Sequence, residues 1–328
     1  MSIKQFPGGI VTQNPTAPTT AAAKGIWTLA QAADFIKQGI WPRIPGAPTI
    51  GTATAGVNSA TVTYTAPTDL GTGTVTYTAT SSPGSLTGTG ASPITVSGLT
   101  NGTAYTFTVT ASTPGGTGPA SAASNSVTPA LPAIGSAFGG GFFAGQISTA
   151  GNSIADYNLV VGPVASAESV NIQWKTSGTG GESTSVINGP TNSAAMNSAT
   201  YPAAQFCEGL TIGGFTDWYM PAQNELEVCY YNLKPTTTNN NTASGINANA
   251  VPARASNYTA GTPAQTSATA FQSAGAEAYS TTTYWASTQS PTYSQNGMYI
   301  RFSNGNLSSA SKTGSFLYRV RAVRRVAV

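Results

Sequence analysis

The side chains that most enzymes use for catalysis are scarce in this chain. Its 328 residues contain no histidine, two cysteines and ten aspartates and glutamates. Without imidazole the chain cannot build a Ser-His-Asp or Cys-His nucleophile or a histidine metal site, and two thiols are too few for a four-thiolate zinc site. We therefore expect a protein that is not an enzyme and that holds no metal or other cofactor.

Two acids, Asp217 and Glu225, share the segment 214–226 (GFTDWYMPAQNEL). Paired carboxylates can cleave glycosides, but neither acid has an evident partner to shift its pKa. A structural role is the alternative that we favour: Asp217 would satisfy backbone donors in a turn, and Glu225 would stabilise a helix N-terminus. We likewise expect Trp218 and Trp285 to be core aromatics, with sugar stacking as the alternative.

The two cysteines, Cys207 and Cys229, lie on two predicted helices, at about 201–209 and 222–233. Both face inward at helical spacing, so a disulfide could form if the two backbones approach within about 7 Å. Reduced, buried thiols are equally compatible, because assembly in a cytoplasm keeps thiols reduced. The spacing leaves both alternatives open.

Composition predicts a folded chain with a polar but uncharged surface. Charged residues make up 7% of the chain, against about 25% in ordinary soluble proteins. Disorder would require low hydrophobicity and high net charge, yet 40% of residues are hydrophobic and the net charge is +3. No apolar run reaches about 18 residues and no signal peptide is visible, so we expect neither membrane insertion nor Sec export.

Residues 1–45 form the first of three regions that differ in composition. A Pro/Thr/Ala-rich arm without periodicity is followed by a short helix signal, framed by Trp27 and Trp41. A small packed plug is one interpretation. Because the segment 25–42 resembles segments of phage structural proteins, we also consider an extended docking arm, with Trp27 and Trp41 as anchors onto other virion proteins.

Residues 46–130 alternate apolar side chains with threonine, as in Tyr105, Phe107 and Val109, which is typical of strands with one buried face. Turn signals between these runs favour a two-sheet antiparallel sandwich. The region resembles a fibronectin type III domain, with Tyr105 at the tyrosine-corner position and Tyr64 where the family usually has tryptophan. With one charged residue in the region, we expect a spacer rather than a ligand-binding domain.

In residues 131–328, the hydrophobic patterns predict strands and helices on both sides of the 214–226 motif. The motif, the segments 284–288 and 320–325, and an upstream Gly-rich segment with Trp174 resemble the Lcl-type C-terminal domain of bacterial collagen-like adhesins and phage tail proteins. The resemblance implies an α+β, C-type-lectin-like fold. The calcium-binding tripeptides of true C-type lectins are absent, so we infer no calcium-dependent lectin activity.

Six basic residues and no acid fall in the last 28 positions, which raises the question of nucleic-acid binding. Arg319 and Arg321 alternate with Val320, however, as expected for a strand with one charged face. We expect these cations to pair with the eight acids of the same region, with Arg321 in a structural role and no nucleic acid bound.

The segment 236–283 is long, poor in apolar anchors and rich in Asn and Thr, which is typical of a binding loop. Together with 293–306 it is our predicted ligand-binding surface. The residues that we expect to stack on a ligand or donate hydrogen bonds to it are Tyr258, Tyr279, Tyr293, Asn296 and Arg301.

Taken together, the expected architecture is an N-terminal arm with a short helix, an all-β fibronectin type III sandwich and an α+β C-type-lectin-like domain. The expected function is that of a phage virion protein, a tail-fibre or tail-tip adhesin that binds a host cell-surface glycan or protein and assembles as a homo-oligomer, with a trimer first. The alternative is a head-decoration or baseplate component without receptor binding.

Overall fold

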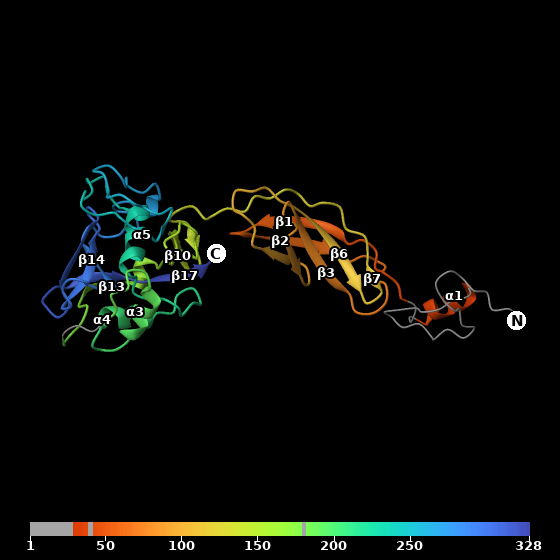
Figure 1. The fold of residues 1–328 in the computed structure, drawn as a ribbon, viewed down its shortest axis with the longest axis horizontal. Coiled ribbons are helices and arrows are strands. Elements are labelled where there is room, and N and C mark those ends of the chain that lie inside the picture. The colour runs from red at the N-terminus through yellow and green to blue at the C-terminus, as the bar shows by residue number, and fades with distance from the viewer. Residues whose placement is uncertain (1–28, 39–41, 179–181) are drawn as a thin grey trace. The chain divides into compact units, whose positions relative to one another are not determined.

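The computed structural model describes residues 29–38, 42–178 and 182–328. Contacts divide the chain into two compact units, Met1–Leu131 and Pro132–Val328, which we describe separately (Figure 1). The first unit contains helix α1 (Leu29–Lys37), where a short helix was predicted. The predicted arm and the anchors Trp27 and Trp41 lie outside the described residues.

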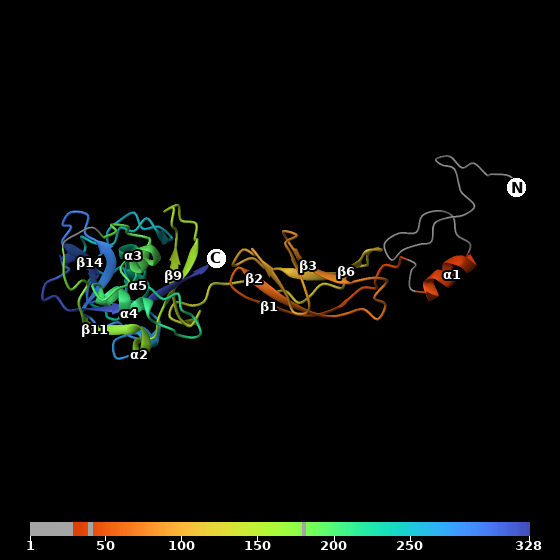
Figure 2. The ribbon, with the colours of Figure 1, turned by 90° about the horizontal axis from the view of Figure 1, so that it is seen from below.

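The strands of the first unit, between Thr49 and Thr117, form a two-sheet antiparallel sandwich, whose layers can be followed in Figure 2. One sheet has the order β1 (Thr49–Ala55), β2 (Ser59–Thr65), β5 (Ile94–Ser97). The other has the order β4 (Thr87–Thr89), β3 (Thr76–Ser82), β6 (Thr106–Thr113), β7 (Gly116–Thr117). The predicted sandwich is thereby confirmed.

The alternating pattern of this unit places one side chain in two in its core. Val62 of β2 and Phe107 and Val109 of β6 are buried, and the threonines between them are not. The hydroxyl of Tyr105 accepts a hydrogen bond from the backbone N–H of Thr100 at 3.1 Å. This is the tyrosine corner of β-sandwich domains, at the position predicted from the sequence.

The second unit is rich in β-structure, with two five-stranded sheets. In the first, the order is β12 (Ala250–Val251), β9 (Gly141–Ile147), β10 (Tyr157–Val161), β17 (Val323–Ala327), and β8 (Ala137–Phe138) also pairs with β9. In the second, it is β11 (Glu168–Ile172), β16 (Tyr318–Arg321), β13 (Thr283–Gln289), β14 (Asn296–Arg301), β15 (Asn306–Ser311). Strands β13 and β16 are parallel, and the other pairs are antiparallel.

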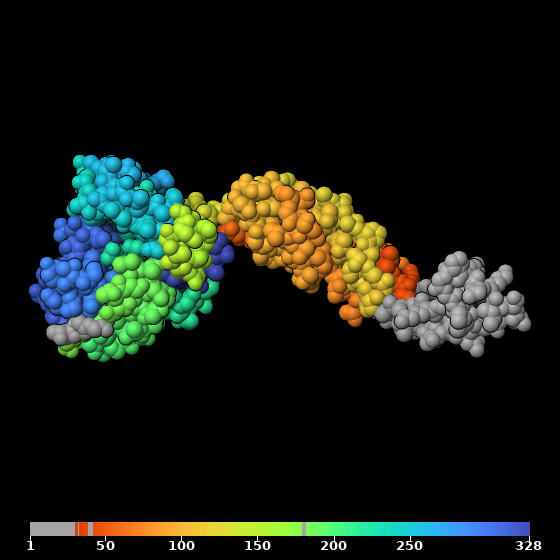
Figure 3. Space-filling model, in the orientation of Figure 1, coloured from red at the N-terminus to blue at the C-terminus, as the bar shows by residue number. Residues whose placement is uncertain are grey.

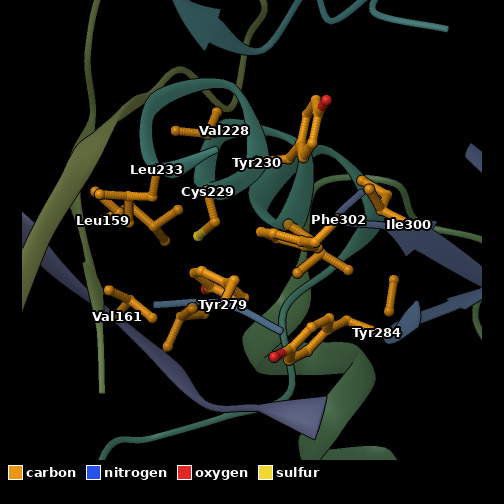
Figure 4. Close-up of a cluster of buried hydrophobic side chains, with 14 of the residues drawn as sticks. Leu159, Val161, Val228, Cys229, Tyr230, Leu233, Tyr279, Tyr284, Ile300 and Phe302 are labelled. Atoms are coloured by element: carbon orange, nitrogen blue, oxygen red, sulfur yellow. The ribbon is translucent and has the colours of Figure 1, made fainter. Parts of the chain in front are cut away.

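Short helices complete this unit: α2 (Val164–Ala167), α3 (Gly189–Ala195), α4 (Pro202–Glu208), α5 (Gln223–Leu233) and the 3-10 turn η1 (Thr269–Phe271). The sequence predicted α4 and α5 but not α3, β11 or β15. Helix α5 packs on β9, β13 and β14, and one hydrophobic cluster lies between this helix and strands of both sheets (Figure 4). A second cluster surrounds Trp174, Trp218 and Trp285.

Within the described residues, no helix has the length and hydropathy that crossing a membrane requires.

The long segment 236–283 has little regular structure but is packed into the unit. It contains only β12 and η1, and in Figure 3 it forms a continuous part of the surface of this unit. Its aromatic side chains Tyr258, Phe271 and Tyr279 belong to the hydrophobic cluster beneath α5. The segment therefore supplies core residues, although its composition predicted a binding loop that is poor in apolar anchors.

Candidate functional site

Asp217 of the 214–226 motif is bound by an arginine from the far end of the chain. Arg324 donates from Nε and one terminal nitrogen to the two carboxylate oxygens, at 2.7 and 2.9 Å. These hydrogen bonds lower the pKa of Asp217 below its ordinary value. The partner of Asp217 is thus the guanidinium of Arg324, and not only the backbone donors of a turn, as the sequence suggested.

Glu225, in the first turn of α5, is fully buried and has three hydrogen-bond donors. The Ala222 N–H (2.8 Å), the Tyr219 hydroxyl (2.5 Å) and Nε of Arg325 (2.8 Å) all donate to its carboxylate. Burial raises the pKa of Glu225, and the charge of Arg325 opposes that shift. The position at the helix N-terminus agrees with the expectation, and Arg325 is an ionic partner that was not evident from the sequence around Glu225.

The two tryptophans and Arg321 are buried. The rings of Trp218 and Trp285 are 1% and 0% exposed, so the sugar-stacking alternative has no exposed ring to use. Arg321 is completely buried, donates to the Gly162 carbonyl at 2.8 Å and forms an ion pair with Glu277 at 2.7 Å. These contacts fit a structural function for the motif.

Two more of the six cations near the C-terminus have carboxylate partners. Arg319 pairs with Glu168 and Lys312 with Glu182. The predicted pairing with acids of the same region is therefore present, although it is largely buried rather than on an exposed charged face. Across the described part of the chain, Arg301 forms no ion pair.

Both cysteines are free, and they lie in different hydrophobic clusters. Burial raises the pKa of the Cys229 thiol to about 12 and that of Cys207 well above its ordinary value. Of the two alternatives, this structure has the reduced, buried thiols. Within the described residues, no group of three or more Cys, Asp or Glu side chains could hold a metal ion.

Two of the predicted ligand-binding tyrosines are core residues. The Tyr279 ring stacks on Phe302 with centroids 4.0 Å apart, inside the cluster drawn in Figure 4. Tyr258 is 5% exposed and donates its hydroxyl hydrogen to Glu227. The prediction that these two rings are available for stacking is corrected: the loop turns its aromatic side chains inward, because the cluster beneath α5 removes them from water.

The other three predicted residues do not form one site. Tyr293 is 56% exposed, and Asn296 is half-buried and donates to the Ser309 hydroxyl at 3.2 Å. Arg301 is exposed at the opposite end of β14 from Asn296, which at roughly 3.3 Å per residue separates the two by about 17 Å. Any role of these residues in binding stays a prediction.

Two adjoining hollows are present where the long loop meets α5. Their volumes are about 330 and 250 Å³, and Tyr231 and Thr262 line both. The larger hollow is completed by Ile134 and the segment 261–267, and the smaller by the segment 254–259. Concave sites of this kind, with an aromatic surface and a few polar groups, are the usual places of ligand binding.

Tyr231 is the half-buried aromatic residue shared by the two hollows. The guanidinium of Arg254 lies over its ring, 4.1 Å from the centroid, and Arg254 is itself held by an ion pair with the buried carboxylate of Glu227. The Tyr258 ring lies 6.3 Å away at a tilt of 36°. Tyr231 is therefore held in place by packing, while Asn257 and Thr262 add exposed polar side chains to the lining.

Sequence reasoning identified the loop but missed Tyr231, Arg254 and Asn257. A signal for Tyr231 exists in the helical spacing of α5: Leu226, Cys229, Tyr230 and Leu233 share the buried face, and Tyr231 is one step away from it. No comparable signal marks the other two, because their positions depend on an irregular backbone.

The first unit has a hollow of its own, of about 450 Å³, beside Tyr64 and Tyr77. The two rings are 4.6 Å apart at a tilt of 38°, and the Tyr64 hydroxyl donates to the Gly90 carbonyl at 3.0 Å. Tyr64 occupies the position where tryptophan was expected from the family pattern. The smaller ring and the neighbouring small residues Gly90 and Ala91 leave this space open.

In the described residues, the chain combines a β-sandwich unit with a second, β-rich unit. Residues 46–127 match the fibronectin type III domain family, and residues 166–324 match the Lcl C-terminal domain family. The chain thus carries both domains that the sequence motifs indicated.

Among solved structures, the chain is similar to a crystal structure of titin domains, with 21% identity over 27% of this chain and 33% of that chain and a TM-score of 0.25. It is also similar to a solution structure of a human fibronectin type III domain, with 25% identity over 28% of this chain and 86% of that chain and a TM-score of 0.23. The chain spans about a third of the length of the titin structure. No curated protein matches the chain.

Proposed function

We propose that the chain is a phage virion protein, a tail-fibre or tail-tip adhesin whose C-terminal domain binds a glycan on the host cell surface. The observation that supports this most directly is the pair of hollows that share Tyr231. The Lcl match over residues 166–324 is consistent with a structural role and supports the resemblance to phage tail proteins. A C-type-lectin-like fold for this domain is part of the same proposal.

The chemistry of the hollows favours a neutral saccharide. Pyranose rings present C–H faces that pack on an aromatic side chain, and their hydroxyls exchange hydrogen bonds with amides and hydroxyls. Tyr231 offers the ring, and Asn257 and Thr262 offer polar groups. The one cation in the lining, Arg254, is already neutralised by Glu227, so a ligand gains little from carrying an acidic group.

In this proposal the other regions place the binding domain on the particle. The fibronectin type III domain is a spacer, since Asp69 is the single charged residue between positions 46 and 130. The first 45 residues attach to other virion proteins. Assembly as a trimer would multiply weak single-site contacts with a glycan-coated surface.

The test uses the full chain and a Tyr231→Ala variant in binding to host cells and to arrays of neutral glycans. We expect the variant to lose about fivefold in affinity, because aromatic stacking on a ligand contributes on the order of 1 kcal/mol. Ile154→Ala, at a residue that is 68% exposed and lines neither hollow, is the matched control and should bind normally.

Two other results would change the assignment. If Tyr293→Ala loses binding while Tyr231→Ala does not, the ligand binds at the loop before β14, as the sequence suggested. If the unaltered chain binds neither host cells nor glycans, the adhesin proposal is wrong and the head-decoration or baseplate alternative is favoured.

A further inference from the structure

A cluster of buried polar side chains lies away from both hollows, around Glu182. The carboxylate of Glu182 forms ion pairs with two lysines, Lys175 and Lys312, and accepts a hydrogen bond from the Tyr201 hydroxyl at 2.9 Å. The side chains of Lys175, Lys312 and Glu182 are 6%, 1% and 5% exposed. Two ammonium groups therefore share one carboxylate, which leaves an excess positive charge inside the domain.

Lys312 also contacts the side-chain amide of Gln289, the last residue of β13. Its Nζ lies 2.8 Å from Oε1 of Gln289. The same oxygen accepts a hydrogen bond from the backbone N–H of Glu182 at 3.3 Å. An amine, an amide carbonyl and a carboxylate are thus in mutual contact, with an N–H donor directed at the carbonyl oxygen.

We propose that Lys312 and Gln289 are joined by an intramolecular isopeptide bond, with Glu182 as the catalytic residue. Glu182 accepts a proton from Nζ of Lys312, and the amine attacks Cδ of Gln289. The Glu182 N–H stabilises the negative charge that develops on Oε1. That proton then passes to the departing Nε2, and Nζ gives a second proton to Glu182. The Cδ–Nε2 bond breaks and the Nζ–Cδ bond remains. The released ammonia takes the second proton from Glu182 and leaves as ammonium, so that Glu182 is again ionised.

The surroundings of these groups favour this exchange. Burial lowers the pKa of the Lys312 amine, which favours the neutral, nucleophilic form. Nζ lies 5.0 Å from the centre of the Trp174 ring, and Gln289 is 7% exposed, so little water can compete as a nucleophile. The contacts also hold the amine and carbonyl together, which replaces a bimolecular encounter by an intramolecular one.

The reaction also removes the charge imbalance of the cluster. Before it, two cations face one carboxylate, and a buried charge without a full partner is costly. Afterwards the Lys312 nitrogen is part of a neutral amide, and Lys175 pairs with Glu182 alone. The bond would join the end of β13 to the residue that follows β15, which closes the segment 289–312 covalently around β14.

The test is mass spectrometry of the denatured, full-length chain, followed by digestion with trypsin. We expect an intact mass that is lower than the sequence mass by one ammonia. We also expect a branched product in which the peptide containing Gln289 is attached to Lys312, with no cleavage after that lysine. A full sequence mass together with normal cleavage at Lys312 would overturn the proposal.

Variants separate this bond from other sources of ammonia loss, such as succinimide formation at Asn-Gly pairs. Lys312→Arg keeps a positive charge but should abolish the branched peptide, and Glu182→Gln should reduce or abolish it. Lys175→Arg is the matched control, because Lys175 also pairs with Glu182 but no contact joins it to Gln289, and it should keep the branched peptide. A branched peptide that persists in Lys312→Arg would contradict the assignment.

Discussion

The two domains are stabilised by different means. Between residues 46 and 130 there is one charged side chain, whereas residues 131–328 contain nine basic and eight acidic ones. The sandwich has a single apolar core built from alternating strand residues. The C-terminal domain has two apolar clusters and a set of ion pairs, several of which are buried.

The difference follows from how much of each domain is regular. Strand pairing satisfies most of the backbone of the sandwich, so apolar side chains alone can complete it. The C-terminal domain contains long irregular segments. Its buried arginines donate hydrogen bonds to carbonyl and carboxylate groups of these segments. Arg321, for example, donates to both Gly162 and Glu277. The charged side chains of this domain therefore connect segments that no regular hydrogen-bond ladder joins.

The largest effect should come from breaking one of these buried pairs. Arg321→Ala leaves the Gly162 carbonyl without the guanidinium and the Glu277 carboxylate with the Val164 N–H but without a cation. Removing one partner of a buried ion pair typically costs about 3–5 kcal/mol. We expect the free energy of unfolding of the C-terminal domain to fall by about that amount, measured by urea denaturation.

The control for this variant is the exposed pair Arg43–Asp69, whose side chains are 42% and 48% exposed. Asp69→Ala should cost less than about 1 kcal/mol, since exposed ion pairs contribute little. If the two substitutions lowered the free energy of unfolding by equal amounts, the proposed difference in how the two domains are stabilised would be wrong.

A smaller effect is expected from filling the hollow of the sandwich. Tyr64→Trp adds apolar volume beside Tyr77, where about 450 Å³ is open. Because filling a space in a packed domain commonly stabilises it by about 0.5–2 kcal/mol, we expect the melting temperature of the sandwich to rise by several degrees. Calorimetry measures this, with Tyr77→Phe as a variant of unchanged size. A lower melting temperature for Tyr64→Trp would mean that the space does not accept the larger ring.

The smallest effect that we expect is a change in how the stability of the C-terminal domain depends on pH. The pKa of Asp217 is lowered by Arg324, so this carboxylate stabilises the fold above its ordinary pKa of 3.8 and loses that contribution as pH falls through the folded-state value. Glu225 has the opposite sign, because burial raises its pKa. We expect Asp217→Asn to lower the melting temperature of the C-terminal domain at pH 7, and to lower it by less at a pH well below 3.8.

A melting temperature of Asp217→Asn that differs from the parent by the same amount at both pH values would contradict this ionic role. The sandwich, whose region contains the single acid Asp69, serves as the internal reference in the same scans.

The strands of the sandwich could be predicted because their signal is local. Alternation with a period of two residues places Val62, Phe107 and Val109 on one face whatever the partner strand is, and the structure buries all three. The same holds for α4 and α5, whose apolar residues recur at helical spacing. The tyrosine corner at Tyr105 was recognisable because its hydrogen bond spans only five residues.

The candidate site could be located only in outline. The segment 236–283 was singled out by its length, but a polar, irregular segment has no period from which burial can be derived. Tyr258 and Tyr279 therefore looked available for binding and proved to be core residues, while Tyr231, on a predicted helix, lines the hollows.

The sequence by itself determined the domain types, the strand faces and the scarcity of catalytic side chains. Tertiary structure alone decided which distant charges meet, since Arg324 is 107 residues from Asp217 and Lys312 is 130 residues from Glu182 along the chain. The physical reason is that alternation and helical spacing act over a few residues. Ion pairs and the contact between Lys312 and Gln289 depend instead on how distant segments pack, which no local pattern specifies.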